Sequence, residues 1–148
     1  MPANAMRKSE EETMSFLEHL PIFLSFNVDE LSTLARHMSY IHLQRGEYLF
    51  VEGDPGTFLG FFRNGILEVQ KRRESGDYVT LARLTKGASI GEMALIDKSP
   101  RSATVIARQA ATLVTLTDRA FDLLAERHPP LGIKVIRKIA RLLSLNMR

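Results

Sequence analysis

Residues 91–105 read GEMALIDKSPRSATV, and this stretch determines how the rest of the chain is interpreted. A glycine and an acid stand at one end of it, and an arginine with two small residues stands near the other: Gly91, Glu92, Arg101, Ser102 and Ala103. Glycine permits backbone conformations that other residues avoid, and one helical turn over 92–95 would present unpaired N–H groups to an anion. The planar, permanently charged guanidinium of Arg101 matches two phosphate oxygens. We therefore expect the loop to enclose a small anion.

Glu92 needs a separate explanation, because a carboxylate beside a phosphate repels it unless the carboxylate has a donor of its own. A ribose hydroxyl is such a donor. A ligand that carries both a phosphate and a sugar hydroxyl therefore explains Glu92 and Arg101 together better than free phosphate does. The alternative is a structural loop in which Glu92 and Arg101 form a salt bridge with each other.

The composition is that of a globular domain: the chain has 148 residues, 45% hydrophobic and 25% charged, with a net charge of +3. The mild positive charge fits an anionic ligand without requiring nucleic acid. No apolar run approaches the ~20 residues of a membrane span, and the N-terminal MPANAMRKSEEET lacks the apolar core of a signal peptide. The absence of cysteine excludes disulfides and thiolate metal sites. We expect one domain over 1–148, located in the cytoplasm and not in a membrane.

Helical patterns occupy both ends of the chain, over 1–38 and 118–148. Ser9 with the three glutamates after it resembles a capping box that opens a helix, which Pro21 would end. Asn27 is a second N-cap, followed by apolar residues at helical spacing as far as Met38. At the other end, Asp118 would cap a helix to about Arg127, and the prolines 129 and 130 would separate it from a final helix over 131–148.

From Ser39 to Thr117 the pattern changes to short runs of β-branched and aromatic residues separated by turn signals. Asn64-Gly65 predicts a two-residue hairpin between FLGFF and ILEV. Gln109-Ala110 predicts a turn between ATVIAR and ATLVTLT, and residues 71–77 (KRRESGD) predict a solvated hairpin turn. Strands spaced by about ten residues suggest an antiparallel sandwich or barrel.

GEMALIDKSPRSATV resembles the phosphate-binding cassette of the cyclic nucleotide-binding domain family, and RGEYLFVEGDPG and FFRNGILEVQ are similar to the family's earlier strands and turns. The resemblance covers the chain from about Phe16 to its end. It implies a mainly β fold with flanking α-helices, in which an antiparallel double-stranded β-helix (a jelly-roll-like β-roll) spans 39–117. The chain looks like a catabolite activator protein-like sensor domain without a DNA-binding domain.

The resemblance also implies a role for individual residues. Gly91 and Glu92 would bind the ribose; Ala94, Arg101, Ser102 and Ala103 would bind the phosphate; and Val69, Leu81 and Asn146 would pack against or bond the nucleoside base. The implied ligand is cyclic AMP, with cyclic GMP as the alternative because the Ser102 hydroxyl could serve guanine. One position departs from the catabolite activator protein, in which an arginine that braces the ribose-binding glutamate stands where this chain has Leu142.

The final helix has two apolar stripes and one basic face. The first stripe is Ile133, Ile136, Ala140, Leu143 and Met147; the second is Val135, Ile139, Leu142 and Asn146; the basic face is Lys134, Arg137, Lys138, Arg141 and Arg148. Because this apolar arc is wider than a coiled-coil seam, one stripe can pack on the roll while the other meets a partner helix. This predicts a homodimer through the C-terminal helix; the alternative is that both stripes cover the roll.

We expect a regulatory sensor whose ligand shifts the C-terminal helix and acts on an unknown effector. No nucleophile-elbow pattern is present, and His19, His37, His42 and His128 lack metal-ligand spacing, so we expect no enzyme, catalytic residue, metal or cofactor beyond the nucleotide. Two alternatives remain: a degenerate fold that serves as a dimerisation or docking module, and the sensor part of a larger transcription regulator. The chain stops at Arg148, before a helix-turn-helix would fit, so DNA binding by this chain alone is not expected.

Overall fold

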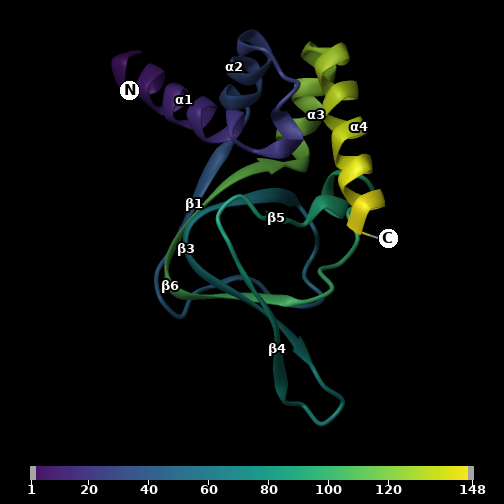
Figure 1. Cartoon of the computed structure of the whole chain (residues 1–148). Helices are drawn as coiled ribbons and strands as arrows, with labels where there is room; N and C mark the ends of the chain where they lie inside the picture. Colours follow the sequence, from purple (N-terminus) through teal and green to yellow (C-terminus); the bar gives the residue numbers. More distant parts are fainter. Residues whose placement is uncertain (1–2, 147–148) are drawn as a thin grey trace. The chain divides into compact units, whose positions relative to one another are not determined.

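The computed structural model describes the backbone of residues 3–146 and the side chains of residues 9–145 (Figure 1). Two compact units make up the chain: the strands lie in residues 39–118, and the helices come from the residues up to Met38 and from Arg119 onward. A single domain over 1–148 stays a prediction. No helix in the described part of the chain combines the length and the apolar character that crossing a membrane requires.

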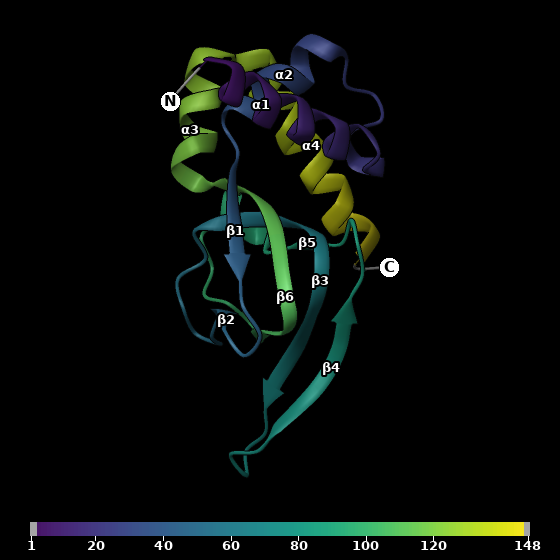
Figure 2. The ribbon, with the colours of Figure 1, turned by 90° about the vertical axis from the view of Figure 1, so that its left-hand side faces the viewer.

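The strand unit is one antiparallel sheet, ordered β1-β6-β3-β4, in which β2 also pairs with β6 and β5 with β3. Its strands are β1 (Ser39–Leu43), β2 (Tyr48–Phe50), β3 (Phe58–Arg72), β4 (Tyr78–Leu84), β5 (Ser89–Ile90) and β6 (Thr104–Thr117). The long strands β3 and β6 pair along most of their length and curve together (Figure 2). This arrangement confirms the predicted mainly β fold, an antiparallel roll with helical segments before and after it in the chain.

Two predicted turns are wrong, because Asn64-Gly65 and Gln109-Ala110 lie inside the continuous strands β3 and β6. They face each other across the ladder, where Asn64 pairs with Thr112, Ile66 pairs with Gln109, and the register shifts. Gly65 has a φ of +99°, and a Cβ at this position would lie 2.2 Å from the Ala110 carbonyl oxygen. The two turn signals therefore mark a β-bulge at which both strands bend together.

The predicted turn between β3 and β4 is confirmed. The Arg73 backbone N–H donates to the Asp77 carbonyl at 2.7 Å, and Gly76 N–H donates back to the Arg73 carbonyl at 2.9 Å. The basic residues 71–73 beside this turn are exposed, as expected for a solvated hairpin. Figure 1 shows the hairpin extending away from the other strands.

Alternation along the strands places one apolar face inside the roll. The core of this face comprises Leu43, Phe62, Leu67, Ile90, Val105, Ala107, Ala111 and Leu113. Leu67 and Leu113 are completely buried, and each such side chain contributes about 1.5–3 kcal/mol relative to exposure. Val69, Leu84 and Phe50 are partly buried and pack against this core, so they have surface left for another contact.

The helical unit contains α1 (Ala3–Glu18), the short 3-10 helix η1 (Pro21–Phe23), α2 (Val28–Arg36), α3 (Asp118–Arg127) and α4 (Pro129–Asn146). The capping box predicted at Ser9 is wrong, because α1 begins at Ala3 and Ser9 lies within it. The Ser9 carbonyl accepts a hydrogen bond from Thr13 Oγ1 at 2.9 Å. Residues 3–8 continue the helical pattern towards the N-terminus, so the acidic run does not mark a helix start.

The predicted cap of α2 is confirmed. Asn27 Oδ1 accepts from the Glu30 N–H at 2.8 Å, and Glu30 Oε1 accepts from the Asn27 N–H at 2.9 Å. This reciprocal pair satisfies two N–H groups that the first turn leaves without helical partners, which is worth about 1 kcal/mol.

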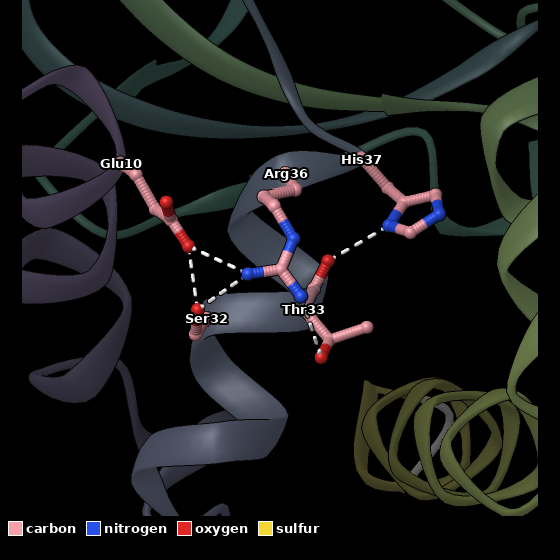
Figure 3. Close-up of polar contacts among 5 residues, drawn as sticks. All are labelled: Glu10, Ser32, Thr33, Arg36 and His37. Carbon is pink, nitrogen blue, oxygen red and sulfur yellow. Dashed lines mark hydrogen bonds and ion pairs between the residues drawn. The ribbon is translucent and has the colours of Figure 1, made fainter. Parts of the chain in front are cut away.

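A polar cluster joins α1 to α2 (Figure 3). The Glu10 carboxylate accepts hydrogen bonds from Ser32 Oγ and from Arg36 Nη1, the latter at 3.0 Å. Arg36 Nη2 donates to Thr33 Oγ1 at 3.3 Å within α2. Because the Arg36 side chain is 54% exposed, the ion pair positions the helices but adds at most about 1 kcal/mol.

The two apolar stripes of α4 differ in burial. Val135 and Ile139 of the second stripe are buried, whereas Ile133 of the first stripe is 57% exposed and Ala140 is exposed. Near the start of α4, a Cβ on Gly132 would lie 2.8 Å from the Ala125 Cα, so this glycine allows α3 and α4 to approach closely. The first stripe is only partly exposed, because Ile136 and Leu143 are half-buried. The homodimer stays a prediction.

Candidate anion-binding site

A cavity of about 340 Å³ lies within the strand unit, at the lower end of the range for small-molecule sites. Most of its wall comes from the loop that the sequence singled out, including Gly91, Glu92, Ala94, Arg101, Ser102 and Ala103. Apolar side chains from the strands complete it: Phe50, Val69, Leu84, Ile90 and Val105. The cavity therefore has a polar, charged side and an apolar side.

The loop begins with the predicted helical turn. Gly91 has φ +77° and ψ +35°, in the left-handed region, and the 3-10 helix η2 (Glu92–Leu95) follows it. A Cβ on Gly91 would lie 2.0 Å from Arg101 Nη1 and 2.9 Å from the Phe58 carbonyl oxygen. Glycine is thus required twice, for the backbone conformation and for the close approach of the guanidinium.

Arg101 is only 6% exposed and is held from several sides. Its Nη2 donates to the Phe58 carbonyl at 2.8 Å, and its guanidinium lies over the rings of Phe50 and Phe58, 4.2 and 4.6 Å from their centroids. Its backbone N–H donates to the Asp54 carbonyl, and its carbonyl accepts from Gly53 N–H, both at 2.8 Å. The side chain is therefore fixed before any ligand arrives.

The charge of Arg101 is not balanced by an adjacent carboxylate. Among the described residues no ion pair includes Arg101, so the structure does not show the alternative salt bridge with Glu92; its buried Nε also has no hydrogen-bond partner. Burial lowers the pKa of Arg101, and the negative charges of Glu92 and Asp54 partly oppose this shift. A buried guanidinium without a negatively charged partner is costly, and an anion in the cavity would offset that cost.

Glu92 is partly buried and accepts a hydrogen bond from Ser89 Oγ. It lines the same cavity as Arg101 without pairing with it, so the cavity presents an acceptor and a cation at separate points. Ser102 is exposed, and its carbonyl accepts from Lys71 Nζ at 2.7 Å, which attaches the loop to β3. The site can therefore hold a ligand that combines an anion with hydroxyl donors.

The three residues predicted to contact the base lie in different places in the structure. Val69 lines the cavity, but Leu81 does not: it is 58% exposed on β4. Val69 pairs with Ala82 and Gln70 with Thr80, so Leu81 is the extra residue of a bulge and turns out of the alternating pattern. Leu84 lines the cavity wall in place of Leu81, and only the register of β4 could have identified Leu84 as the lining residue. Asn146 ends α4, and its side chain lies outside the described residues.

A second buried charge, missed in the sequence, lies on the opposite face of β3 from Val69. Glu68 is 5% exposed, and its carboxylate accepts from Arg108 Nε at 3.1 Å, Arg108 Nη2 at 3.3 Å and Thr80 Oγ1 at 2.7 Å. These hydrogen bonds, led by Arg108, lower the pKa of Glu68 to about 2. Glu68 thereby joins β3 to β4 through Thr80 and to β6 through Arg108.

Comparison with known proteins places this site in a family. Residues 40–128 match the family model of the cyclic nucleotide-binding domain. The chain is 35% identical over 133 residues to glutaminase 1 of Bradyrhizobium diazoefficiens, which covers 90% of this chain and 21% of the relative. It is 30% identical over 126 residues to the cAMP-dependent protein kinase regulatory subunit of Mycosarcoma maydis, covering 82% and 23%. The chain thus spans about a fifth of the length of each of these curated relatives.

Among solved structures, a cyclic nucleotide-binding domain from Methylobacillus flagellatus KT superposes with a TM-score of 0.81 at 32% sequence identity, covering 95% of this chain and 79% of that one. The family match includes both the strands and the loop that surround the cavity. The chain therefore belongs to the cyclic nucleotide-binding domain family.

Proposed function

We propose that this chain is a regulatory domain that binds cyclic AMP in the cavity between η2, the loop at 99–103 and the apolar side chains of the roll. The observation that carries the proposal is Arg101: a buried, prepositioned cation without a carboxylate partner lines the cavity beside Glu92. A cyclic phosphodiester supplies one negative charge, and its ribose supplies a hydroxyl for the carboxylate. The relative named as a cAMP-dependent kinase regulatory subunit supports cyclic AMP as the ligand.

Each residue then has a defined part in binding. The Arg101 guanidinium would pair with the cyclic phosphate, helped by backbone contacts from Ala94, Ser102 and Ala103. Glu92 would accept from the ribose hydroxyl, next to Gly91. Val69 would pack against the nucleoside, joined by Leu84 and Phe50 on the same wall; a base contact by Asn146 stays part of the proposal.

The proposed effect of ligand binding on the rest of the chain rests on the sequence pattern of α4. We expect ligand binding to change the placement of α4 and to act through a homodimer formed by its partly exposed first stripe, in the cytoplasm. The chain itself is proposed to be non-catalytic. Its curated relatives include both an enzyme and a kinase regulatory subunit, of which it matches about a fifth, so the effector could be on the same or on another chain.

The test is a calorimetric titration of the folded, nucleotide-free protein with cyclic AMP, cyclic GMP and, as a control, 5′-AMP. We expect saturable one-to-one binding of cyclic AMP, weaker binding of cyclic GMP, and much weaker binding of 5′-AMP, which lacks the ring phosphodiester. Tighter binding of cyclic GMP would correct the identity of the ligand. Absence of binding by both cyclic nucleotides would reject the sensor function and favour a docking module.

A further inference from the structure

One face of α4, beside its buried stripe, is basic and hollowed. Lys134, Arg137, Lys138 and Arg141 follow one another at intervals of three, one and three residues, which places them on one side of the helix. With Ser25, Pro130 and Ile133 they line a groove of about 410 Å³, here called the α4 basic groove. All its residues belong to the helical unit, so it shares no residue with the nucleotide cavity.

One of the four cations has a structural role. Lys134 Nζ lies 2.9 and 3.1 Å from the two carboxylate oxygens of Glu30, donates to the Ser25 carbonyl at 2.9 Å, and lies 4.6 Å from the ring centroid of Phe26. It therefore links α4 to the segment before α2 and fixes one wall of the groove.

The other three cations have no such compensation. Among the described residues no ion pair or hydrogen bond is recorded for the Arg137, Lys138 or Arg141 side chains, and α4 contains no acidic residue. Like charges at i,i+3 and i,i+4 weaken a helix by about 0.2–0.5 kcal/mol per pair. These three cations thus lower the stability of the helix, and their side chains form no ion pair or hydrogen bond within the described part of the chain.

We propose that the α4 basic groove binds an acidic segment of a partner protein. Carboxylates of the segment would pair with Arg137, Lys138 and Arg141, and Ile133, which is 57% exposed, would receive an apolar side chain. At Ile133 the segment would compete with the homodimer contact proposed for the first stripe. The apolar contact and the concave shape favour a peptide, and the groove has no aromatic side chain on which nucleic-acid bases could stack. This proposal does not depend on nucleotide binding.

The test uses fluorescence anisotropy of a labelled helical peptide of about 15 residues, with Glu on one face and Leu on the other. We expect saturable binding that weakens at higher salt. The variant Arg137→Glu, Lys138→Glu, Arg141→Glu should lose at least about tenfold in affinity. The matched control is Arg45→Glu, Arg72→Glu, Arg73→Glu, which changes the net charge equally at exposed positions of the strand unit and should bind as the wild type does.

Circular dichroism checks that each variant is folded. A second variant, Arg137→Gln, Lys138→Gln, Arg141→Gln, removes the positive charges without adding negative ones and should also lose affinity. Equal weakening in the α4 and control variants would show attraction by net charge alone and would overturn the proposal. No binding by the wild type, or tighter binding of a single-stranded oligonucleotide of equal charge, would also overturn it. Calorimetry with cyclic AMP on the same samples tests the nucleotide site independently, so failure of the peptide to bind can be distinguished from failure of the nucleotide to bind.

Discussion

Glu68 and Arg101 are both buried charged residues of the strand unit, but among the described residues only Glu68 forms ion pairs with opposite charges. Glu68, 5% exposed, accepts hydrogen bonds from Arg108 and Thr80. Arg101, 6% exposed, donates to a carbonyl and lies over two aromatic rings, and among the described residues it forms no ion pair with a carboxylate. Removing one partner of a balanced buried pair destabilises the fold because it leaves the other charge uncompensated, whereas an unbalanced charge beside a cavity favours a ligand of opposite charge. The comparison predicts opposite effects of neutralising the two residues.

The largest effect is expected for Arg101→Leu on nucleotide affinity. Removing the cation should weaken binding of cyclic AMP by about 2–5 kcal/mol, because the phosphate then enters the cavity without a charged partner. The ligand-free protein should lose little stability, since a buried charge without a carboxylate partner is replaced by an apolar side chain. Calorimetry measures the affinity, and urea unfolding measures the free energy of unfolding.

Arg101→Lys serves as the matched variant, because it keeps the charge but not the planar fork. We expect it to bind more weakly than the wild type and more tightly than the leucine variant. An Arg101→Leu protein with wild-type affinity would refute the placement of the phosphate at this residue.

Glu68→Gln should have the reverse effect, with reduced stability and unchanged affinity. We expect a loss of about 1–3 kcal/mol in the free energy of unfolding, because hydrogen bonds to a charged carboxylate become bonds to a neutral amide. The charge of Arg108, left without a carboxylate in this variant, is partly solvated because the Arg108 side chain is 45% exposed, and this limits the loss. Glu74→Gln, at an exposed glutamate of the hairpin, is the control and should change stability little. A Glu68→Gln protein as stable as this control would contradict the structural role of the pair.

The same pair makes stability depend on pH in a defined range. The pKa of Glu68 is lowered from 4.5 to about 2, so the folded state favours the ionised carboxylate. Its contribution is fully present above pH 4.5 and is lost as the pH falls towards 2. The difference in unfolding free energy between the wild type and Glu68→Gln should therefore shrink between pH 5 and pH 2. A difference that stays constant over this range would show that the charge of Glu68 is not the cause.

The sequence pattern indicated the loop that lines the cavity, whereas it misplaced two turns in the strands around it. The loop at 91–105 could be interpreted because a glycine, one helical turn and an arginine within fifteen residues form a local, recognisable pattern. Asn64-Gly65 was misread because turn propensity is local, whereas the long ladder between β3 and β6 decides the path of both strands. Glu68 gave no signal, since its partners Thr80 and Arg108 are distant in sequence and meet it only after three strands pair.

Leu81 shows the same limit within the site. Strand alternation assigns a side to each residue only while the register is regular, and the bulge at Leu81 breaks it. The resemblance named Leu81 as the residue that packs on the nucleoside, but the β4 residue on the cavity wall is Leu84. A single inserted residue is thus enough to exchange which apolar side chain reaches the ligand.

The smallest expected effect concerns how Arg101 is held. Phe50 lies 4.2 Å from the guanidinium and also lines the cavity, so Phe50→Leu removes one aromatic face while leaving the cation in place. We expect affinity for cyclic AMP to fall by about 0.5–1 kcal/mol, the usual size of a cation–π contact. In the double variant Phe50→Leu with Arg101→Leu, the effect of the phenylalanine should disappear, because its action on the ligand passes through the guanidinium. An undiminished effect of Phe50→Leu without Arg101 would instead show that this ring contacts the nucleotide directly.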